Sequence, residues 1–185
     1  MKTAGVVVTY NRKDELIKNI KSILSQSYVV DKYYIIDNHS SDNTEQMLKD
    51  EGILDDHIIQ YVYLEENIGG SGGFYTGLKM AYEDGYDFIC LMDDDGRPAD
   101  NKMMEILVKT AEKLYLTNKF LLLNSLVCGS DNTLSFGLNG GIKTKQIAAE
   151  RENNGLIMGT INPFNGTLVS RELVEKIGYP NKEFF

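Results

Sequence analysis

The 185-residue sequence predicts an α/β fold, with a mostly parallel sheet and flanking helices, from three observations. Short apolar runs alternate with segments whose apolar residues recur at helical spacing, which is the pattern of strand–helix repeats. The runs are apolar throughout rather than at every second position, as expected of parallel strands that are buried on both faces. Several runs end in a polar cluster, where the ligand-binding loops of such sheets begin.

The first half of the chain contains four predicted strands, each followed by a predicted helix. The apolar runs are Ala4–Thr9, Tyr33–Ile36, Ile58–Leu64 and Phe88–Met92. The first helix follows from the spacing of Leu16, Ile17, Ile20, Ile23 and Leu24, with Asn11 as its expected N-cap. The later helices are expected at Thr44–Lys49, at about Phe74–Tyr82 after a glycine-rich loop, and at Met103–Leu114.

The second half has weaker patterns and is expected to form a small antiparallel portion. Strands are predicted at Phe120–Val127 and Asn165–Ser170, and a short helix at Glu172–Ile177. The stretch Asp131–Glu150 is rich in glycine and asparagine, which predicts a short hairpin with loops. The sequence stops at the apolar pair Phe184-Phe185 with no helix or loop to cover it, and we expect a truncated domain.

Composition narrows the classes of function. The net charge of −8 argues against a broad nucleic-acid surface, although a metal ion can screen the phosphates of a single nucleotide. The two cysteines, Cys90 and Cys128, lie in apolar runs and indicate buried thiols in a reducing compartment, so we expect a cytoplasmic protein. No apolar run approaches the roughly 18–20 residues that span a bilayer, and the first strand leaves no room for a signal peptide.

Four polar clusters follow the four strands of the first half. They are Thr9-Tyr10-Asn11-Arg12, the stretch from Asp37 to Asp42, the stretch from Asn67 to Gly73, and Asp93-Asp94-Asp95. The carboxyl ends of parallel strands meet at one edge of a sheet, so we expect the clusters to form a single binding site. The alternative is that each is only a helix cap or a turn.

The acidic cluster is the most informative of the four. Side chains alternate along a strand, so Asp93 and Asp95 are expected to point the same way, with a turn at Gly96. Paired carboxylates suit Mg²⁺ or Mn²⁺, and such an ion typically bridges to a diphosphate. The alternative is a solvated acidic turn.

The glycine-rich stretch matches neither common phosphate motif. Tyr75 stands where the dinucleotide fingerprint needs its third glycine, and the Gly-Lys-Ser/Thr of a P-loop is absent. The glycines still permit close approach of a ligand to backbone N–H groups at a helix N-terminus. The alternative is a flexible connection.

His39 and His57 have no partners at a spacing that suggests zinc binding or a Ser-His-Asp triad.

Together these motifs resemble family 2 glycosyltransferases with the GT-A fold. The resemblance rests on Val6–Arg12, Asp37-Asn38-x-Ser40-x-Asp42, Asn67-x-Gly69-Gly70 and Asp93–Asp95, in that order and spacing, and it covers nearly all of the chain. The stretch Asn67–Phe74 is most similar to the bacterial galactofuranosyl- and rhamnosyltransferase branch. The resemblance implies a Rossmann-like, mostly parallel sheet and an enzyme of cell-wall polysaccharide biosynthesis. Its donor would be a nucleotide-diphospho-sugar, with UDP favoured over thymidine diphosphate and UDP-galactofuranose a candidate.

The resemblance also implies a role for each motif. Donor binding falls to Thr9, Tyr10, Asn11, Arg12, Asp37, Asn38, Asn67, Gly69, Gly70, Ser71 and Asp94. Within this set Asp37 would accept a hydrogen bond from the base, and Asp94 would turn toward the ribose or the sugar. Asp93 and Asp95 would bind the metal, and Asn165-Gly166 would border the site of a glycan or lipid-linked acceptor.

An inverting transfer also needs a carboxylate that takes the proton of the acceptor hydroxyl. The family carries this general base in an acidic motif beyond the position of Phe185, so no catalytic base is expected within this chain. We therefore expect one GT-A domain over residues 1–185, with a nucleotide-sugar half at 1–117 and the start of the acceptor half at 118–185. The remaining part would approach the inner face of the cell membrane.

Two rival functions remain open at this point. A sugar nucleotidyltransferase also uses an α/β sheet, a divalent metal and a nucleotide, but it usually carries Gly-x-Gly-Thr-Arg-Leu where this chain has Val8-Thr9-Tyr10-Asn11-Arg12. A non-catalytic nucleotide-sugar-binding module would keep the fold and the donor pocket without transfer.

Overall fold

The structure is a computed structural model that describes residues 1–129, 131, 133–138, 142–144, 156–157 and 164–184. Its main sheet has six strands in the order β3-β2-β1-β4-β8-β5. The strands are β1 Thr3–Thr9, β2 Lys32–Asp37, β3 Ile59–Tyr63, β4 Phe88–Asp93, β5 Leu122–Asn124 and β8 Thr167–Ser170. The first four are parallel to one another, and β8 runs antiparallel to both β4 and β5. The predicted mixed α/β sheet is confirmed.

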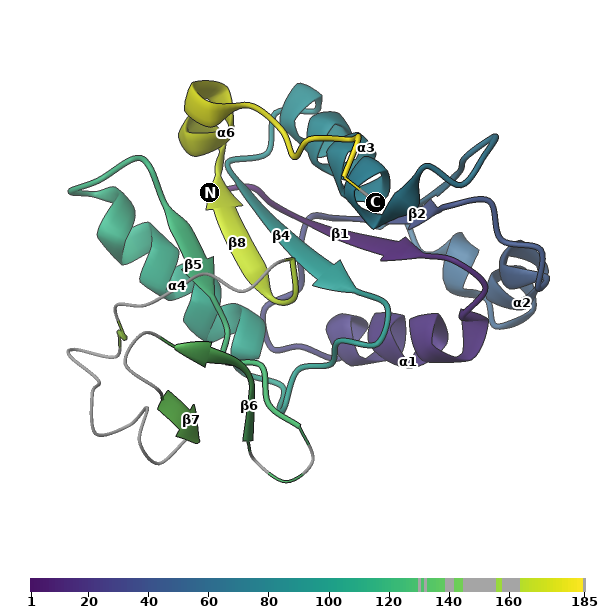
Figure 1. The fold of residues 1–185 in the computed structure, drawn as a ribbon, viewed down its shortest axis with the longest axis horizontal. Coiled ribbons are helices and arrows are strands. Elements are labelled where there is room, and N and C mark those ends of the chain that lie inside the picture. Colours follow the sequence, from purple (N-terminus) through teal and green to yellow (C-terminus); the bar gives the residue numbers. More distant parts are fainter. Residues whose placement is uncertain (130, 132, 139–141, 145–155, 158–163, 185) are drawn as a thin grey trace.

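Helices cover both faces of this sheet, as Figure 1 shows with α3 on one side and α1 on the other. The helices are α1 Lys13–Leu24, α2 Thr44–Asp50, α3 Gly69–Glu83, α4 Met103–Tyr115 and α6 Arg171–Ile177, with a short 3₁₀ helix, η1, at Ile53–Asp55. Alternate strand residues divide the core between the faces. Val7 and Ile35 pack in the cluster with α1 and α4, whereas Val6 and Ile36 pack in the cluster with α3. Each fully buried side chain of this kind contributes about 1.5–3 kcal/mol through loss of water contact.

The glycine-rich stretch is the first turn of a helix and not a loop. We expected the helix to begin near Phe74, but α3 begins at Gly69. Its backbone lies directly against β1, since a Cβ atom at Gly73 would stand 2.5 Å from Cγ1 of Val8 and one at Gly77 would stand 2.3 Å from Cγ1 of Val6. The glycines therefore serve close helix–strand packing, which the expectation of a glycine-rich loop missed.

The expected N-cap of α1 was also wrong. The cap position is Arg12, and Asn11 adopts a left-handed conformation with φ 53°. The Asn11 side-chain oxygen accepts from the backbone N–H of Ser41 at 2.7 Å instead. Asp42 accepts from the first N–H of the helix, that of Lys13, at 3.2 Å. The helix start is thus held by the loop after β2, a partner 30 residues away that local sequence does not reveal.

The second half follows the predicted order with shorter elements. The strand predicted at Phe120–Val127 is reduced to β5, and the strand predicted from Asn165 begins at Thr167. The predicted hairpin is present as β6, Thr133–Leu138, paired antiparallel with β7, Ile142–Thr144. Residues 132, 139–141 and 145–150 of that predicted stretch, and Phe185, lie outside the described residues. Among the helices that the structure describes, none is long and apolar enough to cross a membrane.

Candidate functional site

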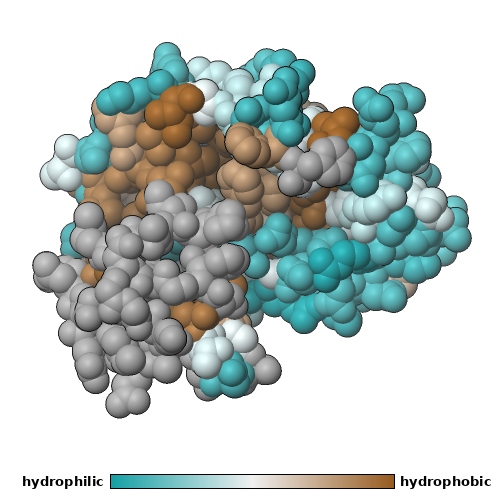
Figure 2. All heavy atoms as spheres, viewed as in Figure 1, coloured by the Kyte–Doolittle hydropathy of each residue, from teal (hydrophilic) through white to brown (hydrophobic). Residues whose placement is uncertain are grey.

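The strand register brings three of the polar clusters together at the carboxyl edge of the sheet. Thr9 lies opposite Asp37, and Val8 lies opposite Asp93, so the ends of β2, β1 and β4 are neighbours. Figure 2 shows a largely hydrophilic surface on this side of the molecule, while apolar atoms gather over α6 and β8. The edge therefore has the location and polarity that ligand sites of α/β sheets have.

Asp37 organises the loop after β2. One carboxylate oxygen accepts from the backbone N–H of Ser40 at 2.7 Å, and the other accepts from the Tyr61 hydroxyl at 2.6 Å. Burial, and then the hydrogen bond to Asp37, raise the pKa of Tyr61 so that its hydroxyl stays a donor. Asp37 is only 1% exposed, although each oxygen retains a second lone pair. Its predicted bond to a nucleotide base stays a prediction.

Asn38 and Asn67 fix the start of α3. The Asn38 side chain accepts from the N–H of Ile68 at 2.9 Å and donates to the side-chain oxygen of Asn67 at 2.8 Å. That same Asn67 oxygen accepts from the N–H of Gly69 at 2.9 Å. The two amides therefore join the loops after β2 and β3 and hold the first turn of α3 at the site.

The glycines and Ser71 of this turn differ in what they face. A Cβ atom at Gly70 would meet nothing within 4 Å, so its backbone is open to a ligand. The Ser71 hydroxyl instead donates to the backbone carbonyl of Asn181 at 2.7 Å, which ties the segment after α6 to α3. Tyr179 packs against Tyr75 with ring centroids 5.4 Å apart and supports the same contact.

Asp94 is the buried carboxylate of the acidic turn, and it is bonded to both Thr9 and Arg12. It is 4% exposed, accepts from the Thr9 hydroxyl at 2.8 Å and lies 3.2 Å from the guanidinium of Arg12. Arg12 also pairs with Asp95 at 3.1 Å. The negative charge of Asp94 is the main reason why the pKa of Arg12 is raised. Thr9 and Arg12, predicted for the donor site, are therefore joined to the acidic turn. Tyr10 beside them is 46% exposed.

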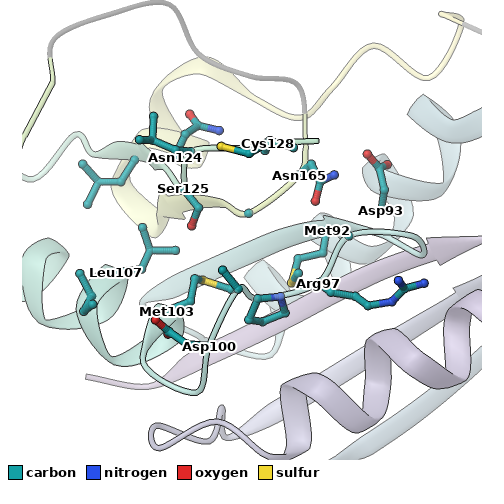
Figure 3. A pocket seen from close by; sticks show the side chains of 18 of the residues that line it. Met92, Asp93, Arg97, Asp100, Met103, Leu107, Asn124, Ser125, Cys128 and Asn165 are labelled. Carbon is teal, nitrogen blue, oxygen red and sulfur yellow. The ribbon is translucent and has the colours of Figure 1, made fainter. Parts of the chain in front are cut away.

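Asp93 and Asp95 open onto a cavity of about 1150 Å³, and Asp94 does not line it. The alternation of side chains along a strand does not explain why Asp93 and Asp95 face the same cavity. The strand β4 ends at Asp93, and a turn closed by a hydrogen bond from the Gly96 N–H to the Asp93 carbonyl follows. Figure 3 shows Asp93 and Asn165 near one end of the cavity, with Met103 and Leu107 of α4 along its wall. Asn165 and Gly166, predicted for the acceptor side, line the same cavity as the acidic turn.

The acidic turn fits a hard divalent cation shared with a ligand. Burial, followed by the charges of Asp95 and Asp94, raises the pKa of Asp93 to about 6, and burial also raises the pKa of Asp94. A cation would relieve this crowding of negative charge. Within the described parts of the chain, no group of three or more histidine, cysteine or acidic residues could hold a metal by itself. Asp93 and Asp95 would thus supply part of the coordination shell, with diphosphate oxygens and water completing it.

Two buried side chains next to the turn, Asn19 and Tyr33, were not among the predicted site residues. Asn19 of α1 donates to the carbonyls of Asp93 and Gly96, at 3.3 and 2.7 Å, and accepts from the Tyr33 hydroxyl at 2.6 Å. The available signal was that Asn19 is a polar residue on the face of α1 that otherwise carries Leu16 and Ile23. A buried amide needs hydrogen-bond partners, so its position on the apolar face predicts bonds to neighbouring segments.

Comparison with protein-family profiles matches residues 6–178 to the family described as Glycosyl transferase family 2. Among curated proteins, the galactofuranosyltransferase GlfT1 of Mycolicibacterium smegmatis is 28% identical over 98% of this chain and 60% of that protein. Poly-beta-1,6-N-acetyl-D-glucosamine synthase of Staphylococcus epidermidis is 26% identical over 94% of this chain and 40% of that protein. The chain thus spans 60% or less of the length of these relatives.

Solved structures agree on the fold. TarS 1–349 of S. aureus superposes with a TM-score of 0.69 at 18% identity, covering 99% of this chain and 51% of that one. The mannosyltransferase PcManGT of Pyrobaculum calidifontis, solved with GDP-Man and Mn²⁺, has a TM-score of 0.66 at 17% identity over 98% of this chain and 48% of that one. These neighbours have the GT-A fold, as the sequence motifs predicted. Because the profile match covers nearly the whole sequence, the chain belongs to glycosyltransferase family 2.

Proposed function

We propose that this chain binds the nucleotide-diphospho-sugar donor of an inverting, metal-dependent sugar transfer to a glycan or lipid-linked glycan. The observation that carries the proposal is the acidic turn: Asp93 and Asp95 face a large cavity, while Asp94 is joined to Thr9 and Arg12 of the neighbouring loop. This arrangement leaves two carboxylates for a cation on the cavity side and one guanidinium close to where a diphosphate would lie.

The proposed donor pocket extends from the acidic turn across the carboxyl edge of the sheet. Tyr10 offers an exposed ring next to the loop in which Asn11 bonds to Ser41. Asp37 and Asn38 would hold the base side, and Gly69 and Gly70 of α3 would approach the sugar or phosphates with backbone N–H groups. Mg²⁺ or Mn²⁺, when bound, would stabilise the charge that develops on the leaving diphosphate.

UDP is the favoured nucleotide, and UDP-galactofuranose is the first donor to test. The support is the similarity to galactofuranosyltransferases over nearly the whole chain, together with a neighbouring TarS structure that contains UDP. The poly-N-acetylglucosamine synthase relative makes UDP-N-acetylglucosamine the second candidate. Both donors share the diphosphate that the acidic turn and Arg12 would bind.

The acceptor would enter the cavity beside Asn165 and Gly166, next to the proposed metal carboxylates (Figure 3). This division keeps residues 1–117 as the proposed donor half and 118–185 as part of the proposed acceptor half. The general base that takes the acceptor proton remains predicted in an acidic segment after Phe185. The family match argues against a sugar nucleotidyltransferase, and a non-catalytic donor-binding module is the second candidate. Transfer to a glycan acceptor would separate the first function from the second.

Calorimetric titration with UDP, in Mn²⁺ and in EDTA, tests the proposal. We expect binding to be weak without the cation, because the diphosphate must approach three carboxylates in a protein of net charge −8. Asp95→Ala should remove most of the gain from Mn²⁺. Asp50→Ala, which removes an exposed carboxylate bonded to Gln46 on α2, is the control and should keep it. Equal affinity in EDTA and Mn²⁺ would contradict the metal role.

The same titration with a panel of donors tests the choice of sugar. UDP-galactofuranose is expected to bind more tightly than UDP-galactopyranose, UDP-N-acetylglucosamine and GDP-mannose in the presence of Mn²⁺. A preference for UDP-N-acetylglucosamine would move the proposal to the second group of relatives. Failure of every UDP compound to bind would contradict the proposed nucleotide.

A further inference from the structure

We propose that Asn19, a buried side chain of α1, is a positioning residue that holds the acidic turn in the shape that binds the divalent cation. The inference rests on the proposed metal-assisted binding of UDP and adds a residue that the donor-site motifs do not contain. Asn19 is not among the residues that line the cavity, and its hydrogen bonds to the turn are to backbone carbonyls and not to the carboxylates.

The contacts of Asn19 span the turn from end to end. Its side-chain nitrogen donates to the Gly96 carbonyl at 2.7 Å and to the Asp93 carbonyl at 3.3 Å. The Asp93 carbonyl also accepts from the Gly96 N–H at 3.0 Å, so one amide group joins the residues that open and close the turn. Asp93 carries the first of these two anchored carbonyls, and Asp94 and Asp95 lie between them, so the amide holds the backbone from which all three carboxylates extend.

Tyr33 fixes the orientation of this amide. Its hydroxyl donates to the Asn19 side-chain oxygen at 2.6 Å, which directs the side-chain nitrogen toward the turn. Both side chains are inaccessible, with Asn19 0% and Tyr33 1% exposed, so water does not replace these bonds. A Cβ atom at Gly5 would stand 2.4 Å from the Tyr33 ring, so the ring has no room to move toward β1.

The opposite side of the turn is also packed. A Cβ atom at Gly96 would stand 2.2 Å from the side-chain oxygen of Asn165, so the turn lies between Asn19 and the predicted acceptor side. A turn held on both sides can keep Asp93 and Asp95 directed at one point despite their mutual repulsion. Metal affinity depends on such outer contacts, whose loss typically costs about 10–100-fold.

The test measures the gain in UDP affinity that Mn²⁺ provides, defined as the ratio of the dissociation constants in EDTA and in Mn²⁺. Asn19→Leu keeps the approximate volume and removes both donated bonds, and we expect it to lower this gain by about tenfold or more. Tyr33→Phe keeps the ring and removes only the hydroxyl that orients the amide. It should lower the gain in the same direction by a smaller factor, and it decides the question if Asn19→Leu does not fold.

Gln26→Leu is the matched control. Gln26 is a buried amide two residues after the end of α1, 6% exposed, which donates to the Asp100 carbonyl at 2.8 Å and accepts from the Met104 N–H at 3.1 Å. It thus holds the far end of the loop that follows the acidic turn. We expect Gln26→Leu and Asn19→Leu both to lower the melting temperature, but Gln26→Leu to leave the gain from Mn²⁺ unchanged.

The outcomes separate this inference from the proposed function. If the unaltered chain shows no gain from Mn²⁺, the metal-assisted function fails. If the unaltered chain shows the gain and both Asn19→Leu and Tyr33→Phe retain it at full size, Asn19 is only a structural residue and the inference is overturned. Direct titration of Mn²⁺ by electron paramagnetic resonance, without UDP, should rank the variants in the same order.

Discussion

Arg12 holds its guanidinium between the carboxylates of Asp94 and Asp95, at 3.2 and 3.1 Å. It therefore offsets part of the negative charge of the acidic turn in the absence of a metal. A divalent cation bound at Asp95 would have to share that carboxylate with Arg12. The two cations, one from the protein and one from solution, are thus expected to act on the same charges.

Replacing the guanidinium should expose this competition. Arg12→Gln is expected to weaken UDP binding in EDTA by about tenfold, because a hydrogen bond to a charged group contributes about 1.5–3 kcal/mol. The gain in affinity from Mn²⁺ should increase, since Asp95 is then free for the cation. Calorimetry with and without Mn²⁺ measures both effects. Lys21→Gln, which removes a cation paired with Glu51 at a distant surface, is the control for net charge. Unchanged affinity in EDTA would show that Arg12 does not contact the donor phosphates.

Asp93 predicts a dependence of stability on pH. Its pKa is raised from the ordinary 3.8 to about 6 by burial and by the neighbouring carboxylates, so the folded chain favours its protonated form. Its contribution to stability is therefore present at low pH and is lost as the pH rises through about 6. Asp93→Asn should raise the melting temperature in EDTA above pH 6, and the difference from the unaltered chain should shrink toward pH 4. A lower melting temperature for Asp93→Asn at pH 7 would contradict this sign.

At the scale of elements, α3 is the helix whose position the site depends on most. Its first turn faces the proposed donor pocket, and its middle lies on the sheet through Gly73 and Gly77. A Cβ atom at Gly77 would meet Cγ1 of Val6 at 2.3 Å and Cγ1 of Ile36 at 3.0 Å. Both neighbours are β-branched side chains with few rotamers, so they have little freedom to yield.

Two glycine-to-alanine changes in this helix should therefore have opposite effects. Gly77→Ala overpacks the interface with β1 and β2 and should cost about 1–3 kcal/mol of unfolding free energy. Gly70→Ala meets nothing within 4 Å, and the better helix former should be neutral or stabilise by up to about 1 kcal/mol. Denaturant unfolding in EDTA measures both without any contribution from ligand. Equal effects of the two substitutions would mean that the helix can move away from the sheet.

At the scale of the whole molecule, the chain combines a net charge of −8 with a cavity whose polar end carries Asp93 and Asp95. Asn165 and Gly166 reach the same cavity because β8, the antiparallel strand, follows directly on them. Asp93 and Gly166 thus lie at the ends of two neighbouring strands of one sheet, β4 and β8, although they are about 70 residues apart in the sequence.

Transfer by residues 1–185 alone is expected to be slow even where the donor binds. The general base is predicted in a segment after Phe185, and such a base typically contributes about 10²–10⁴-fold to the rate. An assay with UDP-galactofuranose and a galactofuranose-accepting glycan, run beside the M. smegmatis relative, would measure the difference. Calorimetric binding of the donor by the same preparation is the control for a folded site. Transfer at the rate of the relative would require a base among the residues of this chain.

The sequence by itself determined the fold class, the order of the elements and the positions of the polar clusters. Apolar runs and helical spacing depend on residues close together in the chain, and so do the motifs that resemble the family. The site residues Thr9, Asp37 and Asp93 could be named for the same reason, because each directly follows or ends an apolar run. Their chemical roles toward a donor remain predictions.

Only the tertiary structure decided which partners these residues have. Asn11 bonds to Ser41 instead of capping α1, and the glycine-rich stretch is helical because β1 lies against it. Asn19 supports the acidic turn from a helix more than 70 residues earlier. Each of these contacts joins segments that are distant in sequence, and no local pattern of residue types specifies such a pairing. The physical reason is that burial and hydrogen-bond satisfaction are settled when the layers pack, after local preference has already chosen helix or strand.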